Sequence, residues 1–206
     1  MGRDRLWLSW FGWVTLGECA GFAVPSATYA ITPSAPAPVQ TALMLAAGCT
    51  EGYILGLAQA RVLRRVLPGT RHWPTATALG AGIAWVCGLV IAELWSEAVL
   101  PLPATAGVTV VLAVTGLMSI GTAQWWLLRG RLARAGWWIT GTAAAWVAGL
   151  AVFLTVSTPL WHEGQPTGAV VVIGMFAATL MAAAMAAVTG AVLWWLLSAT
   201  TARSSV

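Results

Sequence analysis

Three glutamates that lie within long apolar segments are the side chains of this sequence best suited to chemistry. Glu18 and Glu51 each lie near the middle of such a segment, and Glu93 lies toward the far end of another. A charged side chain at the centre of a bilayer costs roughly 2.5–3.5 kcal/mol, so each glutamate in a membrane-spanning segment needs a specific reason to be there. Two carboxyl groups at similar depth could share a proton or bind a cation.

Helical spacing predicts that the two central glutamates face protein rather than lipid. Glu18 falls on one helical face with Phe22, and Glu51 falls on another with Gly48 and Gly52. Small residues let helices approach closely in lipid, and consecutive antiparallel helices would bring the two carboxyls together. No arginine is available at that depth. We therefore expect at least one of the pair to be uncharged near pH 7, donating a hydrogen bond to the other or to a backbone carbonyl.

Two glutamines complete the set of candidate residues. Gln59 and Gln124 occupy the same position in two related segments, near the same membrane face. Their amides could contact a ligand, cap a helix or hydrogen-bond between helices. The glutamates also have a purely structural interpretation, because a protonated carboxyl group can hydrogen-bond a neighbouring helix without binding a ligand. The candidate ligand- or proton-binding residues are therefore Glu18, Glu51, Glu93, Gln59 and Gln124.

The remaining reactive residue types form no recognisable site. Cys19, Cys49 and Cys87 lie within apolar segments and lack the paired spacing of a metal or redox motif. His162 and Glu163 offer too few ligands to hold a metal ion. The sequence contains no nucleophile–base pattern, phosphate-binding loop or zinc-protease motif. We therefore expect no cofactor, no bound metal and no enzymatic activity.

The composition is that of a membrane protein. Of the 206 residues, 59% are hydrophobic and only 8% are charged, and the mean hydropathy is +0.83. Soluble domains usually carry about a quarter charged residues, which keep their surfaces in water. The basic balance of the chain does not indicate nucleic-acid binding, because no soluble basic face is available. Membrane lipids are the expected surroundings, and another membrane protein or a second copy of the chain is a further possible partner.

Six segments are apolar and long enough to cross a bilayer as helices. About 20 residues at 1.5 Å per residue span the hydrocarbon core. Breaks rich in proline, glycine or charge separate the segments. The sequence therefore predicts a single all-α domain over residues 1–206, an integral membrane bundle of six transmembrane helices. The predicted spans are residues 7–30, 41–63, 75–97, 108–128, 137–157 and 169–197.

The arginines orient this bundle. All ten basic residues are arginine, and in a six-span arrangement every one of them falls on the same face. Positive residues are retained on the cytoplasmic side, so both termini are predicted to be cytoplasmic in the inner (plasma) membrane. Arg3, Arg5 and a small-residue ending near Ala30 also resemble a cleavable signal peptide. Glu18 interrupts the apolar region, which favours a retained first span.

An internal repeat divides the chain into three hairpins. Residues 56–64 match residues 121–129 at an offset of 65, and the matches continue past each basic turn. Residues 190–197 echo the same segment at the end of the sixth span, without its glutamine. The predicted repeats cover about 7–67, 73–131 and 137–197. Each begins and ends on the same side, so the copies are parallel and are expected to surround an axis along the membrane normal.

The repeated pattern resembles a known family. Its elements are Gly-x-x-Gln-Trp-x-x-Leu-Arg, a short basic turn, and Trp-x-x-Thr-x-x-x-x-Trp-x-x-Gly-Leu. They are similar to those of a bacterial family of uncharacterised polytopic membrane proteins, and the likeness covers residues 52–150 best. The resemblance implies a helical membrane bundle. It implies no activity, substrate or cofactor.

Two classes of function fit these observations. The intramembrane glutamates favour a protein that binds or transports a small molecule, a cation or protons at a carboxylate site. The scarcity of other polar residues within the spans favours the alternative, a non-catalytic accessory or scaffold subunit of a membrane complex. A polar cavity between the first two spans would distinguish the two.

Overall fold

Six α-helices make up nearly all of the computed structural model, which describes residues 3–98 and 100–203. The helices are α1 (Arg3–Ile31), α2 (Ala37–Leu63), α3 (Trp73–Ser96), α4 (Leu102–Leu128), α5 (Trp137–Leu160) and α6 (Thr167–Arg203). No strand occurs in this described part of the chain. The prediction of an all-α protein is therefore confirmed.

Five of the helices are long and apolar enough to cross a membrane. These are α2 to α6, and together they agree with the prediction of a multi-pass membrane protein. The first helix, α1, has 29 residues but is less apolar than α3 to α6. It contains the charged residues Arg3, Asp4, Arg5 and Glu18, which reduce its apolar character.

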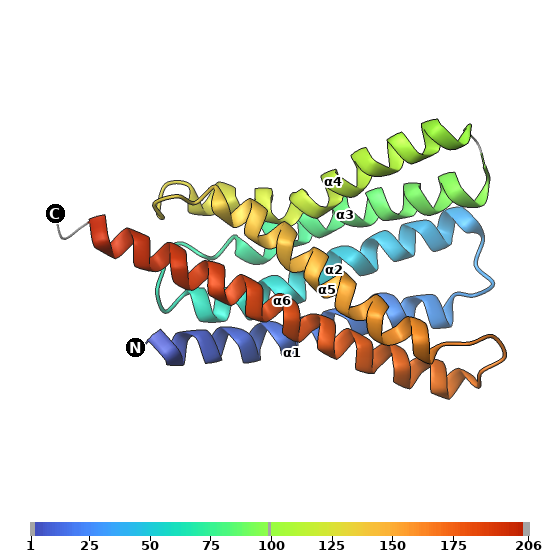
Figure 1. Ribbon diagram of the computed structural model, residues 1–206, viewed down its shortest axis with the longest axis horizontal. Helices are drawn as coiled ribbons and strands as arrows, with labels where there is room; N and C mark the ends of the chain where they lie inside the picture. Colours follow the sequence, from blue (N-terminus) through green and yellow to red (C-terminus); the bar gives the residue numbers. More distant parts are fainter. Residues whose placement is uncertain (1–2, 99, 204–206) are drawn as a thin grey trace.

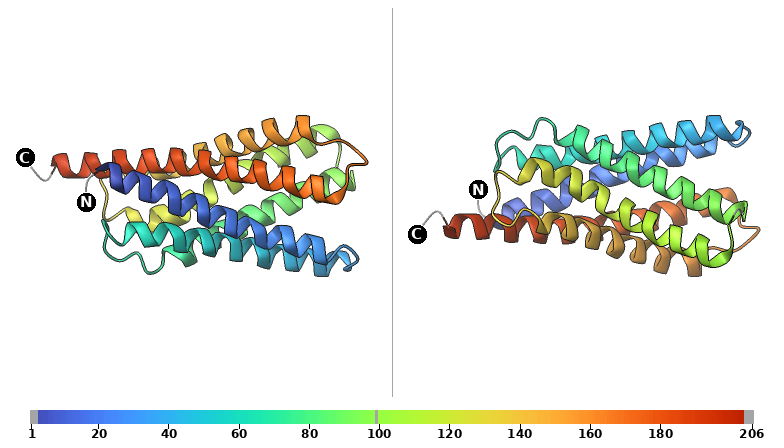
Figure 2. Two further views of the ribbon diagram at one scale, coloured as in Figure 1. Left: turned by 90° about the horizontal axis from the view of Figure 1, so that it is seen from below. Right: turned by 90° about the horizontal axis from the view of Figure 1, so that it is seen from above.

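The helices form a closed ring. Each helix packs against the two that neighbour it along the chain, and α6 packs against α1 to complete the circle. The start of α1, the end of α6, the α2–α3 connection and the α4–α5 connection lie at one end of the bundle, here called the terminal end (Figures 1 and 2). The α1–α2, α3–α4 and α5–α6 connections lie at the other, the hairpin end. Toward the hairpin end, α4 and α5 diverge (Figure 1).

Several helices begin earlier than the sequence predicts. The expected spans started at residues 41 and 108, whereas α2 begins at Ala37 and α4 at Leu102. Both helices have proline in their first turn, at Pro38 and Pro103. Proline is compatible with that turn because the first helical N–H groups have no partner within the helix. Pro38 and Pro103 therefore lie within the first turns of helices and not, as the proline-rich breaks predict, in the preceding loops.

The most tightly packed part of the core lies toward the terminal end. Trp10, Trp73 and Trp138, from α1, α3 and α5, are almost completely buried there and are called the tryptophan cluster. The Trp138 ring lies 6.0 Å, centroid to centroid, from each of the other two in edge-on geometry. Leucines from α2, α4 and α6 surround the cluster. The ring of helices is therefore filled with side chains on this side.

Arginine side chains at the terminal end stack on tryptophans of the neighbouring surface. The Arg61 guanidinium lies 4.3 Å from the Trp13 ring centroid, and that of Arg129 lies 3.3 Å from Trp126. Arg61, Arg129 and Trp126 are exposed. Arginine over an exposed tryptophan is an arrangement suited to the boundary between lipid headgroups and the apolar core.

Candidate functional site

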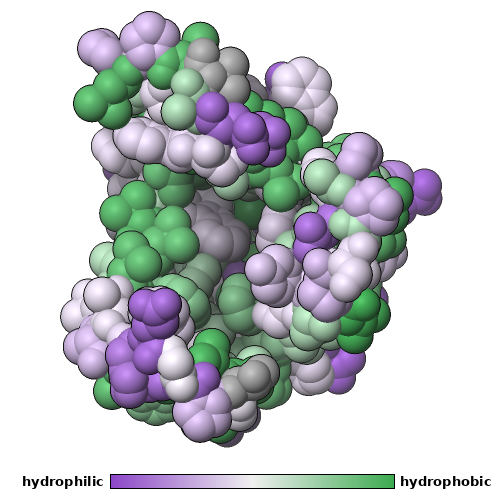
Figure 3. Space-filling model, turned by 90° about the vertical axis from the view of Figure 1, so that its right-hand side faces the viewer, coloured by the Kyte–Doolittle hydropathy of each residue, from purple (hydrophilic) through white to green (hydrophobic). Residues whose placement is uncertain are grey.

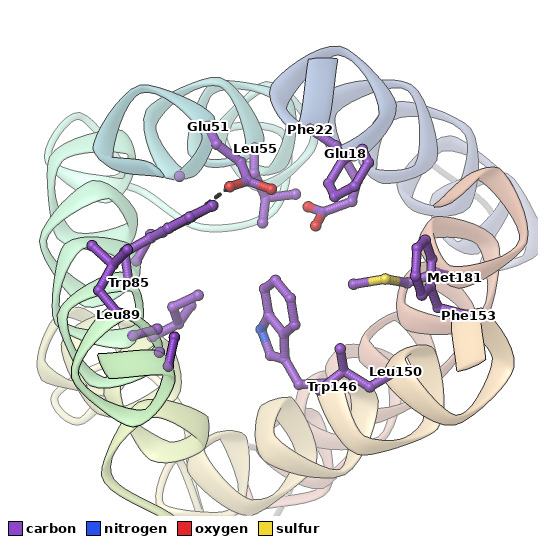
Figure 4. A pocket seen from close by; sticks show the side chains of 16 residues that line it. Glu18, Phe22, Glu51, Leu55, Trp85, Leu89, Trp146, Leu150, Phe153 and Met181 are labelled. Carbon is purple, nitrogen blue, oxygen red and sulfur yellow. Dashed lines mark hydrogen bonds between the residues drawn. The ribbon is translucent and has the colours of Figure 1, made fainter. Parts of the chain in front are cut away.

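A cavity of about 470 Å³ lies inside the ring at the depth of the central glutamates. All six helices contribute to its wall, and Figure 4 shows them surrounding it. Viewed from the hairpin end, the surface of the molecule is hollowed between the helix ends (Figure 3). The lining residues are Glu18, Phe22, Glu51, Gly52, Leu55, Ala81, Ala84, Trp85, Gly88, Leu89, Ala92, Ile120, Trp146, Leu150, Phe153 and Met181.

Glu18 projects into this cavity from the middle of α1 (Figure 4). Only 3% of the residue is exposed. Both oxygens of its carboxyl group are buried, and neither has a hydrogen-bond partner in the described part of the chain. Buried polar groups in proteins are normally hydrogen-bonded, and an unpartnered one costs roughly 1–3 kcal/mol. Glu18 is therefore a polar group held in place without a structural partner.

Glu51 projects from α2 into the same cavity but is anchored. Its Oε2 accepts a hydrogen bond of 2.9 Å from the indole Nε1 of Trp85 on α3. Gly48, one turn away on α2, faces that indole, and any side chain there would overlap the ring. The glycine that was expected to bring helices together thus makes room for the tryptophan that holds Glu51.

The structure brings the two glutamates together but not by the expected hydrogen bond. We expected one carboxyl to donate to the other or to a backbone carbonyl. Instead, Glu51 accepts from Trp85, and the Glu18 oxygens have no partner among the described residues. The physical reason is that α3 supplies an indole N–H at this depth, and this donor occupies an oxygen of Glu51.

Aromatic side chains form much of the remaining wall. Trp146 rises from α5 toward the centre of the cavity, on the side opposite the glutamates (Figure 4). Phe22 and Phe153 lie close together on α1 and α5, with ring centroids 6.4 Å apart. Sequence reasoning did not name Trp85 or Trp146 as site residues. Their signal was present, because they occupy the same place in the matching segments 84–89 and 145–150.

Glu93 does not line the cavity. It lies near the end of α3 at the hairpin end and is exposed. Its distance along the helix from Trp85 is about two helical turns. The structure therefore places it apart from Glu18 and Glu51, although all three were grouped as candidate site residues.

Gln59 and Gln124 form a buried hydrogen-bonded network on the terminal side of the cavity. The Gln124 Nε2 donates to Gln59 Oε1 at 2.8 Å and to Thr77 Oγ1 at 2.9 Å. Each glutamine oxygen also accepts an indole N–H from the tryptophan cluster at 2.8 Å, Gln59 from Trp73 and Gln124 from Trp138. All these polar groups are paired within the protein. The two amides thus connect helices, as one of the sequence-based alternatives proposed.

The cavity contains few groups that could bind an inorganic ion. Apart from the two glutamates, every lining residue is glycine, aliphatic, aromatic or methionine. Among the described residues, no three His, Cys, Asp or Glu side chains gather as metal ligands would. The arrangement presents one free carboxyl group, one anchored carboxyl group and an apolar, aromatic wall. It is suited to a ligand that is largely apolar and carries one small polar or charged group.

Comparisons with protein-family models, with curated proteins and with solved structures found no match for this chain. The resemblance to a family of polytopic membrane proteins therefore stays a prediction.

Proposed function

We propose that this protein binds, and moves across the membrane, a small molecule or cation in a cavity whose polar groups are Glu18 and Glu51. The observation that supports this most strongly is the Glu18 carboxyl group, which is buried, points into the cavity and has no partner among the described residues. An ionisable group inside a membrane bundle is usually part of a substrate, ion or proton path. A group used only for packing would be expected to have its hydrogen bonds satisfied.

The proposal includes six spans in the inner (plasma) membrane, with α1 as the first of them. The packing of α1 between α2 and α6 supports its place in the ring. The hairpin end then faces away from the cytoplasm, because the exposed arginines at positions 61, 64, 65, 71, 129, 131 and 134 all lie at the terminal end. Positive residues are retained inside.

The three hairpins are proposed to be copies related by rotation about the membrane normal. Three tryptophan contacts support this arrangement. Trp73 bonds Gln59, Trp138 bonds Gln124, and Trp10 bonds Thr189 Oγ1 at 3.0 Å. The acceptors at positions 59, 124 and 189 are spaced at a constant interval of 65 residues. Thr189 thus takes the place of the glutamine in α6. This correspondence differs by one helical turn from the alignment of residues 190–197 with residues 121–128.

The alternative function is a non-catalytic scaffold subunit, in which Glu18 and Glu51 only stabilise the bundle. Reaction with dicyclohexylcarbodiimide distinguishes the two. This apolar reagent enters membranes and converts a protonated carboxyl group into a stable N-acylurea. An accessible cavity makes Glu18 reactive in membrane vesicles near neutral pH, and peptide mass spectrometry locates the adduct.

The matched variants are Glu18→Gln and Glu93→Gln. We expect the first to remove the adduct on α1, and the second to leave it unchanged because Glu93 lies outside the cavity. An unreactive Glu18 in correctly folded wild-type protein would favour the scaffold function and overturn the proposal.

A further inference from the structure

The chemistry of the cavity wall restricts the class of ligand. Inorganic cations such as Na⁺, Mg²⁺ and Ca²⁺ require several oxygen ligands arranged around the ion. In the described part of the chain, Glu18 and Glu51 are the only lining side chains with oxygen ligands, and Glu51 already accepts from Trp85. A metal ion here would have to bring most of its water shell into an apolar space. An organic cation needs no such shell.

Charge excludes the opposite class of ligand. Among the residues that the structure describes, the two carboxyl groups are the only ionisable side chains that line the cavity. The described arginine nearest in sequence to either of them is Arg61, which lies in the last turn of α2 at the terminal end. No basic side chain of the lining could therefore compensate an anion. A buried carboxylate without a partner is costly, so a proton or another cation must neutralise it.

The aromatic wall supplies the second half of a binding site for such a cation. Trp146 extends across the cavity toward the glutamates with its six-membered ring foremost, and Trp85 lies beside Glu51 (Figure 4). The face of a tryptophan attracts a positively charged ammonium group, and this attraction is strongest where water is absent. Phe22, Leu150 and Phe153 provide apolar surface next to that position. A cavity of about 470 Å³ is in the size range of sites for small organic ligands.

We propose that the ligand of this site is a hydrophobic organic cation, an amine or quaternary ammonium compound with an aromatic or aliphatic body. This inference rests on the proposed function and specifies its substrate class. The Glu18 carboxylate pairs with the positive group. Trp85 fixes Glu51 as a second negative group, and the cation packs against the face of the Trp146 ring. The apolar body of the ligand fills the part of the cavity lined by Phe22, Leu150 and Phe153.

The test compares two compounds of the same shape. The probe is 3-phenylpropyl-trimethylammonium, and its control is the uncharged isostere in which carbon replaces the ammonium nitrogen. Binding of each radiolabelled compound is measured on full-length protein in nanodiscs of zwitterionic lipid, with empty nanodiscs as the blank. We expect saturable binding of the ammonium compound at one site per chain. The isostere should bind at least roughly tenfold more weakly.

Three variants separate charge from packing. Glu18→Gln should weaken ammonium binding by at least roughly thirtyfold and leave the isostere unchanged. Trp146→Leu should lower the preference for the ammonium compound over the isostere by roughly three- to thirtyfold. Glu93→Gln should bind both compounds as the wild type does. Size-exclusion profiles establish that each variant is folded.

Equal binding of the two compounds, or ammonium binding that survives Glu18→Gln, would overturn the organic-cation inference. So would the absence of ammonium binding to folded wild-type protein. If Glu18 still reacts with the carbodiimide in these cases, the intramembrane site itself stands and only its ligand class is wrong. An unreactive Glu18 would instead remove the proposed function and this inference together.

Discussion

The two central glutamates differ in how the protein supports them. Glu51 accepts a hydrogen bond from Trp85, whereas the buried Glu18 carboxyl has no partner among the described residues. Protein sites that bind ligands often keep such groups at the expense of stability. The free energy of unfolding should therefore respond differently to the loss of each carboxyl group.

We expect Glu18→Met to stabilise the protein by about 1–3 kcal/mol, because it replaces an unpartnered buried polar group with an apolar side chain of similar length. Glu51→Met should give no such gain, since it leaves the Trp85 indole N–H without its acceptor. Thermal denaturation of both variants in the same detergent measures the difference. Equal destabilisation by the two substitutions would mean that Glu18 has a structural partner.

The sequence was sufficient to pair Glu18 with Glu51 but not to identify what holds them. Their proximity follows from spacing, because Glu51 lies on the glycine face of its helix and Glu18 lies at the same depth, whereas the cavity between them was not predicted. The Trp85 hydrogen bond depends on the rotation of α3 about its own axis, which apolar periodicity does not define when every face of a helix is hydrophobic. The exposure of Glu93 could not be predicted for the same reason, because it also depends on the rotation of α3 about its own axis.

At the scale of the helices, the buried amide network joins α2, α3, α4 and α5. Gln124 alone takes part in three hydrogen bonds, with Gln59, Thr77 and Trp138. Hydrogen bonds between membrane helices contribute about 0.6 kcal/mol each on average and up to about 1.7 kcal/mol. This network lies beside the tryptophan cluster and closes the ring on the terminal side of the cavity.

Gln124→Leu should therefore lower the free energy of unfolding by about 1–3 kcal/mol, because it removes these bonds and leaves Trp138 Nε1 unpaired. The control is Gln40→Leu, at a half-exposed position near the start of α2. Unfolding in mixed micelles with increasing denaturing detergent compares the two variants. If Gln124→Leu were as stable as Gln40→Leu, the network would not contribute to helix association.

Helix number and order were predictable because long apolar segments alternate with polar breaks. The residues at which the helices begin and end were less predictable. Pro38 and Pro103 were interpreted as parts of turns, yet proline in the first turn of a helix loses no hydrogen bond. The alignment of α6 was also uncertain by one turn, since Thr189 replaces glutamine as the acceptor and carries no obvious repeat signature.

For the molecule as a whole, the distribution of arginine determines the expected orientation. We expect a C-terminal alkaline phosphatase fusion to be inactive and a fusion within residues 159–166 to be active, because this enzyme folds only outside the cytoplasm. Enzyme activity in intact cells, normalised to the amount of fusion protein, gives the result. An active C-terminal fusion would reverse the proposed topology and place the cavity opening toward the cytoplasm.

Closure of the ring is compatible with three hairpins around an axis along the membrane normal, but no local feature of the sequence identifies which helices meet. Repeats predict hairpins, and hairpins predict that α1 packs on α2, but nothing local requires α1 to contact α6. That contact includes the hydrogen bond from Trp10 to Thr189, which are 179 residues apart in sequence. Because the ring is closed and its terminal side is filled, the central cavity extends toward the hairpin end.

The central claim is that this cavity is an open, cation-attracting site, and thiol accessibility tests it most directly. Cys19, Cys49 and Cys87 are replaced by serine, and Phe22→Cys places one thiol in the cavity wall while both glutamates stay intact. Membrane-impermeant methanethiosulfonate reagents, one cationic and one anionic, are added from the hairpin side, and the rate of modification is measured. The control is Gln124→Cys in the same background, at a fully buried position.

Each rate is divided by the rate of the same reagent with a small thiol in solution, because a thiolate itself reacts faster with a cationic reagent. We expect this normalised rate at position 22 to be at least roughly tenfold higher for the cationic reagent, because the cavity carboxyl groups attract positive charge. The thiol at position 124 should stay unmodified. Equal normalised rates with the two reagents, or a thiol at position 22 that is as protected as the one at position 124, would contradict the account.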